Sequence, residues 1–285
     1  SVELTLVCGE TPSQLFKYCG NIDNLIVLKK KKYSLHWLKL WKILFLTKWY
    51  LIVDLRGSAI SYFLLSNTRL IYRKKKKEIK EHKVISITRG LIKKVAEPEI
   101  KLKSNIKFND TNLKKVQSLK KKYNLVMIAP TANWIGKIWP VERYFDLIVD
   151  LKKKSIFKKT IFIFVGPSSE AKWVGKIINS RKSYIYNLFG NSSLIEIFHI
   201  MKECMLFIGN DSGLMHMASL AKVKTIGLFG PSDKVIYGPW GKGNLTISSP
   251  KSPDDLMGYK GFSSKDCGSL MIDLETNEVL KRITN

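Results

Sequence analysis

The stretch of residues 205–233, MLFIGNDSGLMHMASLAKVKTIGLFGPSD, most strongly constrains how this chain folds. Apolar runs at 205–209 and 225–229 are each followed by a polar turn that contains glycine, and residues 214–221 carry apolar side chains at helical spacing. The order strand, turn, helix, strand, turn is the repeating unit of a parallel sheet. The sequence therefore predicts an α/β protein.

The first of these turns has the composition of an anion site. A helix that begins at Ser212 and Gly213 aims its free backbone N–H groups and its positive dipole end past the end of the preceding strand. Gly213 lets a phosphate approach the backbone, Ser212 adds a hydroxyl donor, and Asp211 caps the helix or accepts hydrogen bonds from ligand hydroxyls. His216 is expected one turn further on, near the same mouth. The alternative is that Asp211 and Ser212 only cap a helix and that His216 is a half-buried histidine without a ligand.

The run NDSGLMHMASLAKVKTIGLFGPSD resembles the signature segment of the family 9 glycosyltransferases, the ADP-heptose:lipopolysaccharide heptosyltransferases. In that family a D-[ST]-G-x-x-H-x-A helix is followed by a strand and a G-P-[ST]-D turn, and both halves occur here at the family's spacing. The resemblance implies GT-B architecture, in which two Rossmann-like domains with parallel sheets face a cleft. It also implies an inverting transfer of heptose, or a related sugar, from an ADP-sugar to a lipopolysaccharide inner-core acceptor.

The start of the chain departs from the family. The family has an earlier strand and a glycine-rich turn that carry the aspartate proposed as general base, whereas residues 2–7 of this chain already read as a later strand. The first βα unit is therefore expected to be missing, because the chain is a fragment or because the unit was lost. In both cases the general base matches no residue here.

A strand at 51–55 is followed by a turn that is similar to the family's D-x-Q-G turn, with Arg56 at the glutamine position. An apolar helix is expected after this turn. The resemblance places the turn on the acceptor side, so Arg56, with Arg69 and Arg73 nearby, is expected to meet acidic sugars or phosphates. Solvated surface charge is the alternative.

The hydrophobic periodicity fades between residues 93 and 122, and we place the domain boundary near Leu119. Residues 1–118 then form the acceptor-side domain, which is incomplete at its start. Residues 119–285 form the domain that binds the nucleotide-sugar. The tail is predicted to end in a helix within 271–283 that crosses back toward the first domain.

The first turn of this second domain, residues 130–140, follows the apolar run at 124–129. Thr131 and Asn133 are candidates for hydrogen bonds to phosphate. The K-x-W-P element that begins at Lys137 matches the family, in which this lysine neutralises the donor pyrophosphate. The resemblance therefore makes Lys137 the group that stabilises the leaving phosphate, with an ordinary surface lysine as the alternative.

Two further positions carry over from the family. Glu170, in the turn after the strand at 160–165, matches the glutamate that reaches the ribose, and the alternative is a favourable acid in the first turn of a helix at 171–178. Ser192 stands where the family places a residue against the adenine ring, although serine offers little stacking surface. Asp233 and the turn at 238–241 complete the expected donor rim.

The four polar turns of the second domain all follow apolar strands, and ligands of open parallel sheets bind beyond the strands' carboxyl ends. We therefore expect these turns to converge on one site. The sequence has no paired acidic metal-binding motif, so catalysis without a metal or other cofactor is predicted. The lysine and the helix amides would stabilise the departing diphosphate in its place.

The net charge of +26 would ordinarily suggest nucleic acid or an anionic membrane as a partner. However, only seven of the 49 basic residues are arginine, the residue that usually makes bidentate contacts to bases. Most lysines are interpreted as solvated surface, with a subset that attracts an acidic substrate or anionic lipid.

The four scattered cysteines, without a CxxC pair, fit a reducing cytoplasm. We expect a cytoplasmic monomer, peripheral to the inner membrane face, that does not bind nucleic acid.

A helix rich in tryptophan and leucine is predicted within residues 33–50, with Trp37, Trp41 and Phe45 on one side. It either covers the sheet or lies on a membrane surface, and its lysines argue against a membrane span.

Three other functions stay open. A catalytically silent homologue would bind the nucleotide-sugar without turnover, and a sugar-nucleotide epimerase of the same architecture would form product without an acceptor. A basic nucleic-acid-binding protein would show steep salt dependence, but the sequence carries no groove-reading motif.

Overall fold

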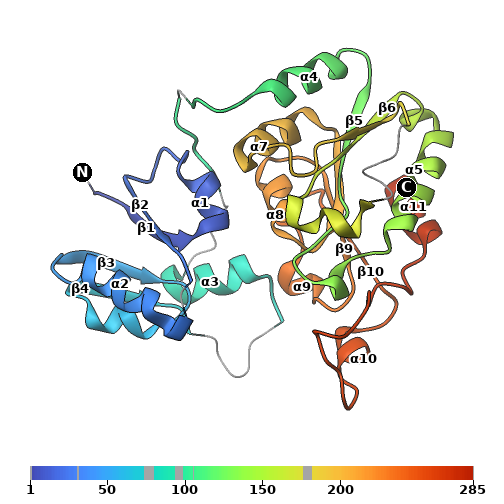
Figure 1. Ribbon diagram of the computed structural model, residues 1–285. Helices are drawn as coiled ribbons and strands as arrows, with labels where there is room; N and C mark the ends of the chain where they lie inside the picture. The colour runs from blue at the N-terminus through green and yellow to red at the C-terminus, as the bar shows by residue number, and fades with distance from the viewer. Residues whose placement is uncertain are drawn as a thin grey trace. The chain divides into compact units, whose positions relative to one another are not determined.

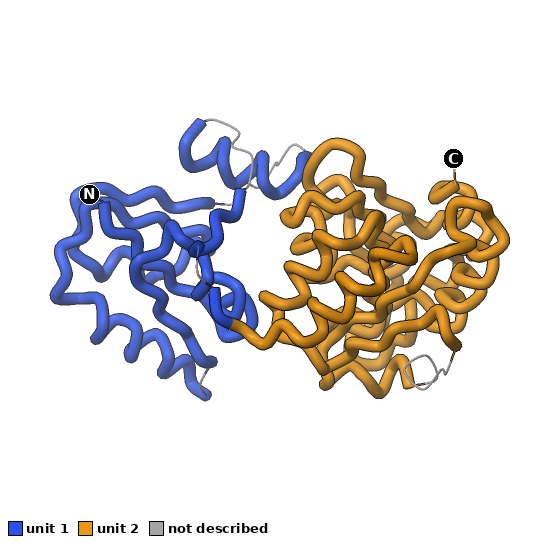
Figure 2. Tube along the Cα trace, turned by 90° about the horizontal axis from the view of Figure 1, so that it is seen from above, with its two compact units in different colours: residues 1–107 blue, residues 108–285 orange. Residues whose placement is uncertain are grey.

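The computed structural model describes residues 2–30, 32–73, 80–93, 99–104, 106–175 and 182–284. The chain forms two compact units, residues 1–107 and 108–285 (Figure 2). Each has its own strands and helices.

Helix α4 (Thr111–Lys120) contains the position at which we expected the domain boundary, between residues 118 and 119. It packs against α7 (Leu194–Glu203). The buried Glu196 carboxylate of α7 accepts hydrogen bonds from the backbone N–H groups of Asn112 (2.9 Å) and Leu113 (3.2 Å). A carboxylate at this place satisfies free N–H groups of α4 and faces the positive end of its dipole. These contacts attach α4 to the second unit.

The first unit contains two separate pairs of parallel strands (Figure 1). Strand β1 (Thr5–Gly9) pairs with β2 (Asn24–Leu28), and β3 (Trp49–Asp54) pairs with β4 (Ser66–Ile71). The helical segments are α1 (Glu10–Phe16), η1 (Lys32–Ser34), α2 (Leu35–Leu44), η2 (Ala59–Phe63) and α3 (Lys83–Ile92), of which η1 and η2 are short 3-10 helices.

The apolar helix expected after the turn at Arg56 is present as the short 3-10 helix η2, and β4 follows it. The side chain of Arg69 on β4 stabilises η2. Its Nε donates to the carbonyl of Ser61 at 2.9 Å, and its Nη2 donates to the carbonyl of Leu64. These bonds satisfy carbonyl groups that a longer helix would satisfy internally.

Helix α2 packs over strands of both pairs. Leu40 and Leu44 are buried beside Leu64. The partly buried side chains around them come from α2 and its C-cap, from β1, β2 and β3, and from η2: Trp37, Trp41, Phe45, Val7, Ile26, Leu28, Trp49, Ile52 and Ile60. The interpretation of this segment as a helix that covers the sheet is confirmed. The helix ends earlier than predicted, since β3 begins at Trp49. Among the described residues, no helix has the length and apolar character needed to cross a bilayer.

The second unit is built on a six-stranded, entirely parallel sheet with the strand order β10-β9-β8-β5-β6-β7. Its four central strands are mainly apolar and buried along their length, because helices cover both faces. The strands are β5 (Asn124–Ala129), β6 (Thr160–Phe164), β7 (Ile185–Asn187), β8 (Leu206–Asn210), β9 (Thr225–Phe229) and β10 (Leu245–Ser248). Besides α4 and α7, the helical segments among the described residues are η3 (Ile135–Lys137), α5 (Val141–Lys153), η4 (Ser155–Phe157), η5 (Ser168–Trp173), α8 (Gly213–Leu220), α9 (Lys234–Tyr237), α10 (Pro253–Met257) and α11 (Thr276–Thr284).

Helices α5 and α11 lie on one face of this sheet, and α7 and α8 lie on the other (Figure 1). The largest core cluster lies under α5, where Leu147 and Leu151 pack with Val126 of β5. Helix α11 packs on α5 and buries Val279 in the same core. The contact made by the final helix is thus within the second unit. Of the helix predicted over 171–178, the structure has the 3-10 segment η5, and residues 176–181 lie outside the described residues.

The strand order reverses between β5 and β8. From β5 the chain proceeds to β6 and β7 on one side, and it then returns to β8, β9 and β10 on the other. At such a switch point the exit turns of two adjacent strands diverge above and below the sheet and leave room for a ligand at its carboxyl edge.

Asn210, fully buried at the end of β8, joins the two exit turns at this switch point. Its Oδ1 accepts hydrogen bonds from the backbone N–H of Trp139 (3.1 Å) and from the hydroxyl of Tyr144 (3.0 Å). Both donors are themselves buried. The pairing of β5 with β8 is therefore extended into the turns by side-chain bonds.

We predict that Asn210→Ala lowers the free energy of unfolding by about 2–4 kcal/mol, because two buried donors lose their acceptor. Tyr144→Phe removes only one of the bonds and should cost about 1 kcal/mol. Urea denaturation measures both changes. Asn133→Ala, at an exposed asparagine in the adjacent turn, is the control that should leave the midpoint unchanged. An Asn210→Ala midpoint equal to that of the control would show that the bonds carry no net stability.

Candidate functional site

The side chains of Lys137 and Asp211 meet at the switch point. Lys137 ends η3 in the exit turn of β5, and Asp211 follows β8 directly. The Lys137 Nζ atom lies 2.7 Å from Asp211 Oδ2, and the two side chains are 26% and 9% exposed. The carboxylate is thus largely enclosed, whereas the ammonium keeps access to solvent. The predicted convergence of these two turns at one sheet edge is observed.

Helix α8 begins beside this ion pair. Its N-cap residue, Ser212, has an extended backbone and makes no side-chain capping bond. The Ser212 Oγ atom is buried and has no hydrogen-bond partner among the described residues. Gly213 is exposed, and a Cβ atom added to it would meet no atom within 4 Å. The start of the helix therefore combines a hydroxyl without a protein partner with open space next to the backbone.

His216 lies one turn further along α8, as predicted. Its Nε2 atom is 3.9 Å from Asp211 Oδ1, and its side chain is 47% exposed. Asp211 is therefore flanked by Lys137 on one oxygen and by His216 on the other. A protonated His216 would add a second positive charge to the same carboxylate.

Thr131 and Asn133 lie in the exit turn of β5 but differ in exposure. Thr131 is only 2% exposed, whereas Asn133 is exposed to solvent. Asn133 is free to reach a ligand at the surface, and Thr131 would need a ligand that enters the turn.

Glu170 is half-buried on η5, in the exit turn of β6. This turn is packed against the turn after β7, since Gly190 donates its N–H to the carbonyl of Gly166 at 2.9 Å. Ser192, two residues further, accepts a hydrogen bond from Asn112 Nδ2 at 3.0 Å. The Ser192 hydroxyl thus helps to hold α4.

On the other side of the switch point, Asp233 Oδ1 caps α9 by accepting the N–H of Val235 at 2.9 Å.

In the first unit, Asp54 shapes the turn that carries Arg56. Its carboxylate accepts the backbone N–H groups of Arg56 (2.9 Å) and Ser58 (2.7 Å) and the Ser58 hydroxyl (2.7 Å). Burial opposes ionisation, but these hydrogen bonds and one from Ser61 outweigh it and hold the pKa of Asp54 below its usual value. These bonds use only the backbone N–H of Arg56, and its side chain is exposed at the turn.

The other two arginines that the sequence points to in this unit have protein partners. Arg69 is engaged with backbone carbonyls, as described above, and Arg73 Nη2 donates to the Tyr62 hydroxyl at 2.6 Å.

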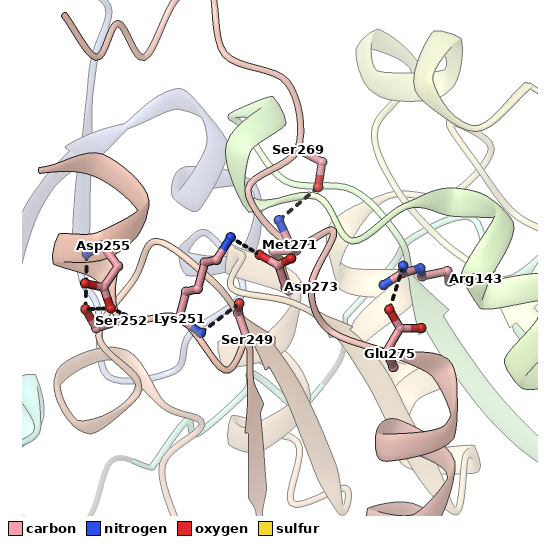
Figure 3. Close-up of polar contacts among 9 residues, drawn as sticks. All are labelled: Arg143, Ser249, Lys251, Ser252, Asp255, Ser269, Met271, Asp273 and Glu275. Carbon is pink, nitrogen blue, oxygen red and sulfur yellow. Dashed lines mark hydrogen bonds and ion pairs between the residues drawn. The ribbon is translucent and has the colours of Figure 1, made fainter. Parts of the chain in front are cut away.

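The contacts made by the tail were not predicted from the sequence. Residues 269–275 bind the turn that holds Lys137: Ser269 Oγ donates to the carbonyl of Ile138 at 2.6 Å, and Trp139 Nε1 donates to the carbonyl of Leu274 at 2.8 Å. Figure 3 shows two ion pairs of the same segment, Arg143 with Glu275 (3.2 Å) and Lys251 with Asp273 (3.0 Å). The contacts with Ile138, Trp139 and Arg143 join residues more than a hundred positions apart, and no periodicity or motif of the sequence predicts them.

The arrangement suits an anion with attached hydroxyl groups. Lys137 and the start of α8 offer positive charge and N–H donors, and Asp211 offers an acceptor. Within the described ranges, no group of three or more His, Cys, Asp or Glu side chains could hold a metal ion.

Solved structures with the same fold include a glycosyl transferase family 9 protein of Veillonella parvula, with a TM-score of 0.73 and 18% identity over 99% of this chain and 87% of that one. The ADP-heptose lipopolysaccharide heptosyltransferase II of Escherichia coli gives a TM-score of 0.68 and 14% identity over 99% of this chain and 88% of that one. These likenesses confirm the predicted GT-B fold class.

Relatives in sequence are heptosyltransferases by name. Lipopolysaccharide heptosyltransferase 3 of E. coli K12 is 30% identical over 129 residues, which is 45% of this chain and 37% of that protein. Lipooligosaccharide heptosyltransferase 2 of Campylobacter jejuni is 24% identical over 199 residues, 67% of this chain and 60% of that protein. The matches thus span less than two thirds of these relatives' lengths.

The model of glycosyltransferase family 9, described as heptosyltransferase, matches residues 56–257, which include both the turn at Arg56 and the whole of the site at the switch point. This chain belongs to glycosyltransferase family 9.

Proposed function

We propose that the protein is a glycosyltransferase that binds the diphosphate of a nucleotide-sugar at the carboxyl edge of the second unit's sheet. The observation that carries the proposal is the meeting of Lys137 and Asp211 beside the open start of α8, at the point where the strand order reverses. The ammonium, the free N–H groups and the unpartnered Ser212 hydroxyl would bind phosphate oxygens there.

The donor proposed is an ADP-heptose, or an ADP-linked related sugar, and the acceptor is a lipopolysaccharide inner core. The names of the sequence relatives support the sugar and the acceptor, and a structural neighbour, the E. coli heptosyltransferase WaaC, has been solved with ADP. In this assignment Glu170 reaches the ribose, Ser192 lies against the base, and Thr131 and Asn133 add hydrogen bonds to phosphate. Arg56, exposed on its turn, would face acidic groups of the acceptor.

The reaction proposed is a direct displacement. An acceptor hydroxyl attacks the anomeric carbon, the bond from that carbon to the diphosphate oxygen breaks, and the sugar is inverted. Negative charge then grows on the departing diphosphate, and Lys137 with the amides at Ser212 and Gly213 would stabilise it. Asp211 holds the ammonium in place and would accept a hydroxyl of the donor, with His216 beside it. The proton of the acceptor passes to a general base that we do not assign to a residue of this chain.

We place this activity in the cytoplasm, in a monomer that works at the inner face of the membrane. The lysine-rich composition, which would attract anionic lipid, supports the placement.

The first test is nucleotide affinity. Lys137→Ala should weaken ADP binding roughly 10-fold in calorimetry and reduce sugar transfer about 100-fold, because a charged donor to the diphosphate is lost. Lys224→Ala removes the same charge just before β9, at the opposite edge of the sheet, and is the matched control. Equal losses in the two variants would mean that general charge, not this site, binds the nucleotide.

A second variant addresses the backbone. Gly213→Ala adds a methyl group into open space, so the fold should keep its stability, and alanine in a helix is favoured by up to about 1 kcal/mol over glycine. The same methyl group should obstruct the phosphate and weaken ADP binding about 10-fold. Gly175→Ala, also without a neighbour within 4 Å, is the control. Unchanged ADP affinity in Gly213→Ala would exclude close approach of a phosphate to this helix.

The third test concerns the metal. Transfer from ADP-heptose to a lipopolysaccharide acceptor should continue in excess EDTA, because the lysine and the amides neutralise the leaving group. Loss of transfer in EDTA, with recovery on addition of Mg²⁺, would contradict the metal-independent mechanism.

A further inference from the structure

The residues on both sides of Lys137 are bound by the same distant segment. Leu270 donates its backbone N–H to the carbonyl of Gly136 at 3.2 Å, and Ser269 Oγ donates to the carbonyl of Ile138 at 2.6 Å. The segment that provides both donors, residues 262–275, is called the C-terminal strap below. Since Lys137 lies between the two bonded carbonyls, the strap restricts the backbone from which the ammonium extends.

Trp134 makes a third connection between this turn and the strap. Its indole ring packs on Gly136, where a Cβ atom would lie only 2.6 Å from the ring. Its Nε1 donates to the carbonyl of Ser264 at 2.7 Å, and the ring of Phe262 meets it edge-on at 6.5 Å. Trp134 is therefore held by the strap on one side and limits the position of Gly136 on the other.

The strap is firmly fixed in the second unit. Met271 and Leu274 are fully buried in the main core. Met271 lies against the exit turn of β9, since a Cβ atom on Gly230 would come within 2.6 Å of its Cγ. Ser269 also accepts the N–H of Met271 at 3.1 Å, and the ion pairs of Asp273 and Glu275 secure the following residues (Figure 3). The strap thus contacts the exit turns of both β5 and β9.

We propose that Trp134 is a positioning residue for the nucleotide site: through its bond to the C-terminal strap it fixes the turn of η3 and thereby the place of the Lys137 ammonium relative to Asp211. The inference rests on the proposed function for its consequence, which is tighter binding of the diphosphate. It concerns residues outside the anion site itself.

The decisive experiment is a double-mutant cycle in the full chain. Trp134→Phe keeps an aromatic ring but loses the Nε1 donor, and we expect ADP affinity to fall about fivefold, the effect of one ordinary hydrogen bond. In a Lys137→Ala background the same substitution should change ADP affinity by less than about twofold, because the group that Trp134 positions is gone.

Trp41→Phe is the matched control. The Trp41 Nε1 donates to the carbonyl of Phe63 at 3.0 Å, so this variant loses the same kind of bond in the first unit, and it should leave ADP affinity unchanged. A fivefold loss in Trp134→Phe that persists in the Lys137→Ala background, or an equal loss in Trp41→Phe, would overturn the proposal.

Amide hydrogen exchange gives a readout that needs no nucleotide. The N–H groups of Lys137 and Ile138 are bonded within η3 to Trp134 and Ile135, both at 3.0 Å. Trp134→Phe should speed exchange at these amides while Trp41→Phe does not. If the wild-type chain binds no ADP, the proposed function fails and exchange alone decides the positioning role. Unchanged exchange in Trp134→Phe would remove that role even if ADP binds.

Discussion

The parallel pairing of β5 with β8 is the constraint on which the site depends. It sets two exit turns side by side at the carboxyl edge, and Asn210 extends the pairing by accepting hydrogen bonds from Trp139 and Tyr144. Lys137 and Asp211, 74 positions apart in the chain, are thereby brought within 2.7 Å. The strand order reverses at the same place, so the turns diverge and the start of α8 stays accessible. The pairing of β5 with β8 therefore determines both the geometry and the charge of the site.

The ion pair explains how a carboxylate can stand where a phosphate is proposed to bind. Asp211 is only 9% exposed, and an unpaired charge there would be costly to bury and would repel an anion. Lys137 offsets that charge and still has ammonium protons to direct elsewhere. In the proposed site, the attraction for a diphosphate would come from the N–H groups and dipole of α8 together with the Lys137 ammonium, and Asp211 would orient that ammonium. This division of roles also makes the exact place of Lys137 important.

The sequence was most informative where local pattern and global fold agree. The boundaries of β5 and β9 match the predicted runs because strands buried on both faces are uniformly apolar and end at polar, glycine-containing turns. The meeting of Lys137 with Asp211 follows from the rule that parallel strands share a carboxyl edge. Three features could not be predicted: the lysine-rich α4, which shows little apolar periodicity and is held by Glu196; β4, whose Arg69 serves the preceding turn; and the bonds from residues 269–275. Each depends on partners that are distant in the chain or lie outside the hydrophobic pattern.

The bond between Glu196 and the start of α4 has a practical consequence for dissecting the protein. A second unit cut at the boundary suggested by the hydrophobic pattern would begin at Leu119 and would lack Asn112 and Leu113. The carboxylate of Glu196, only 2% exposed in the intact chain, would then lose both N–H donors. A buried carboxylate without its hydrogen-bond donors is destabilising, so the truncated piece would lose stability where α7 packs. A piece that starts at Phe108 keeps both N–H donors of Glu196, so the second unit begins earlier in the chain than its apolar pattern suggests.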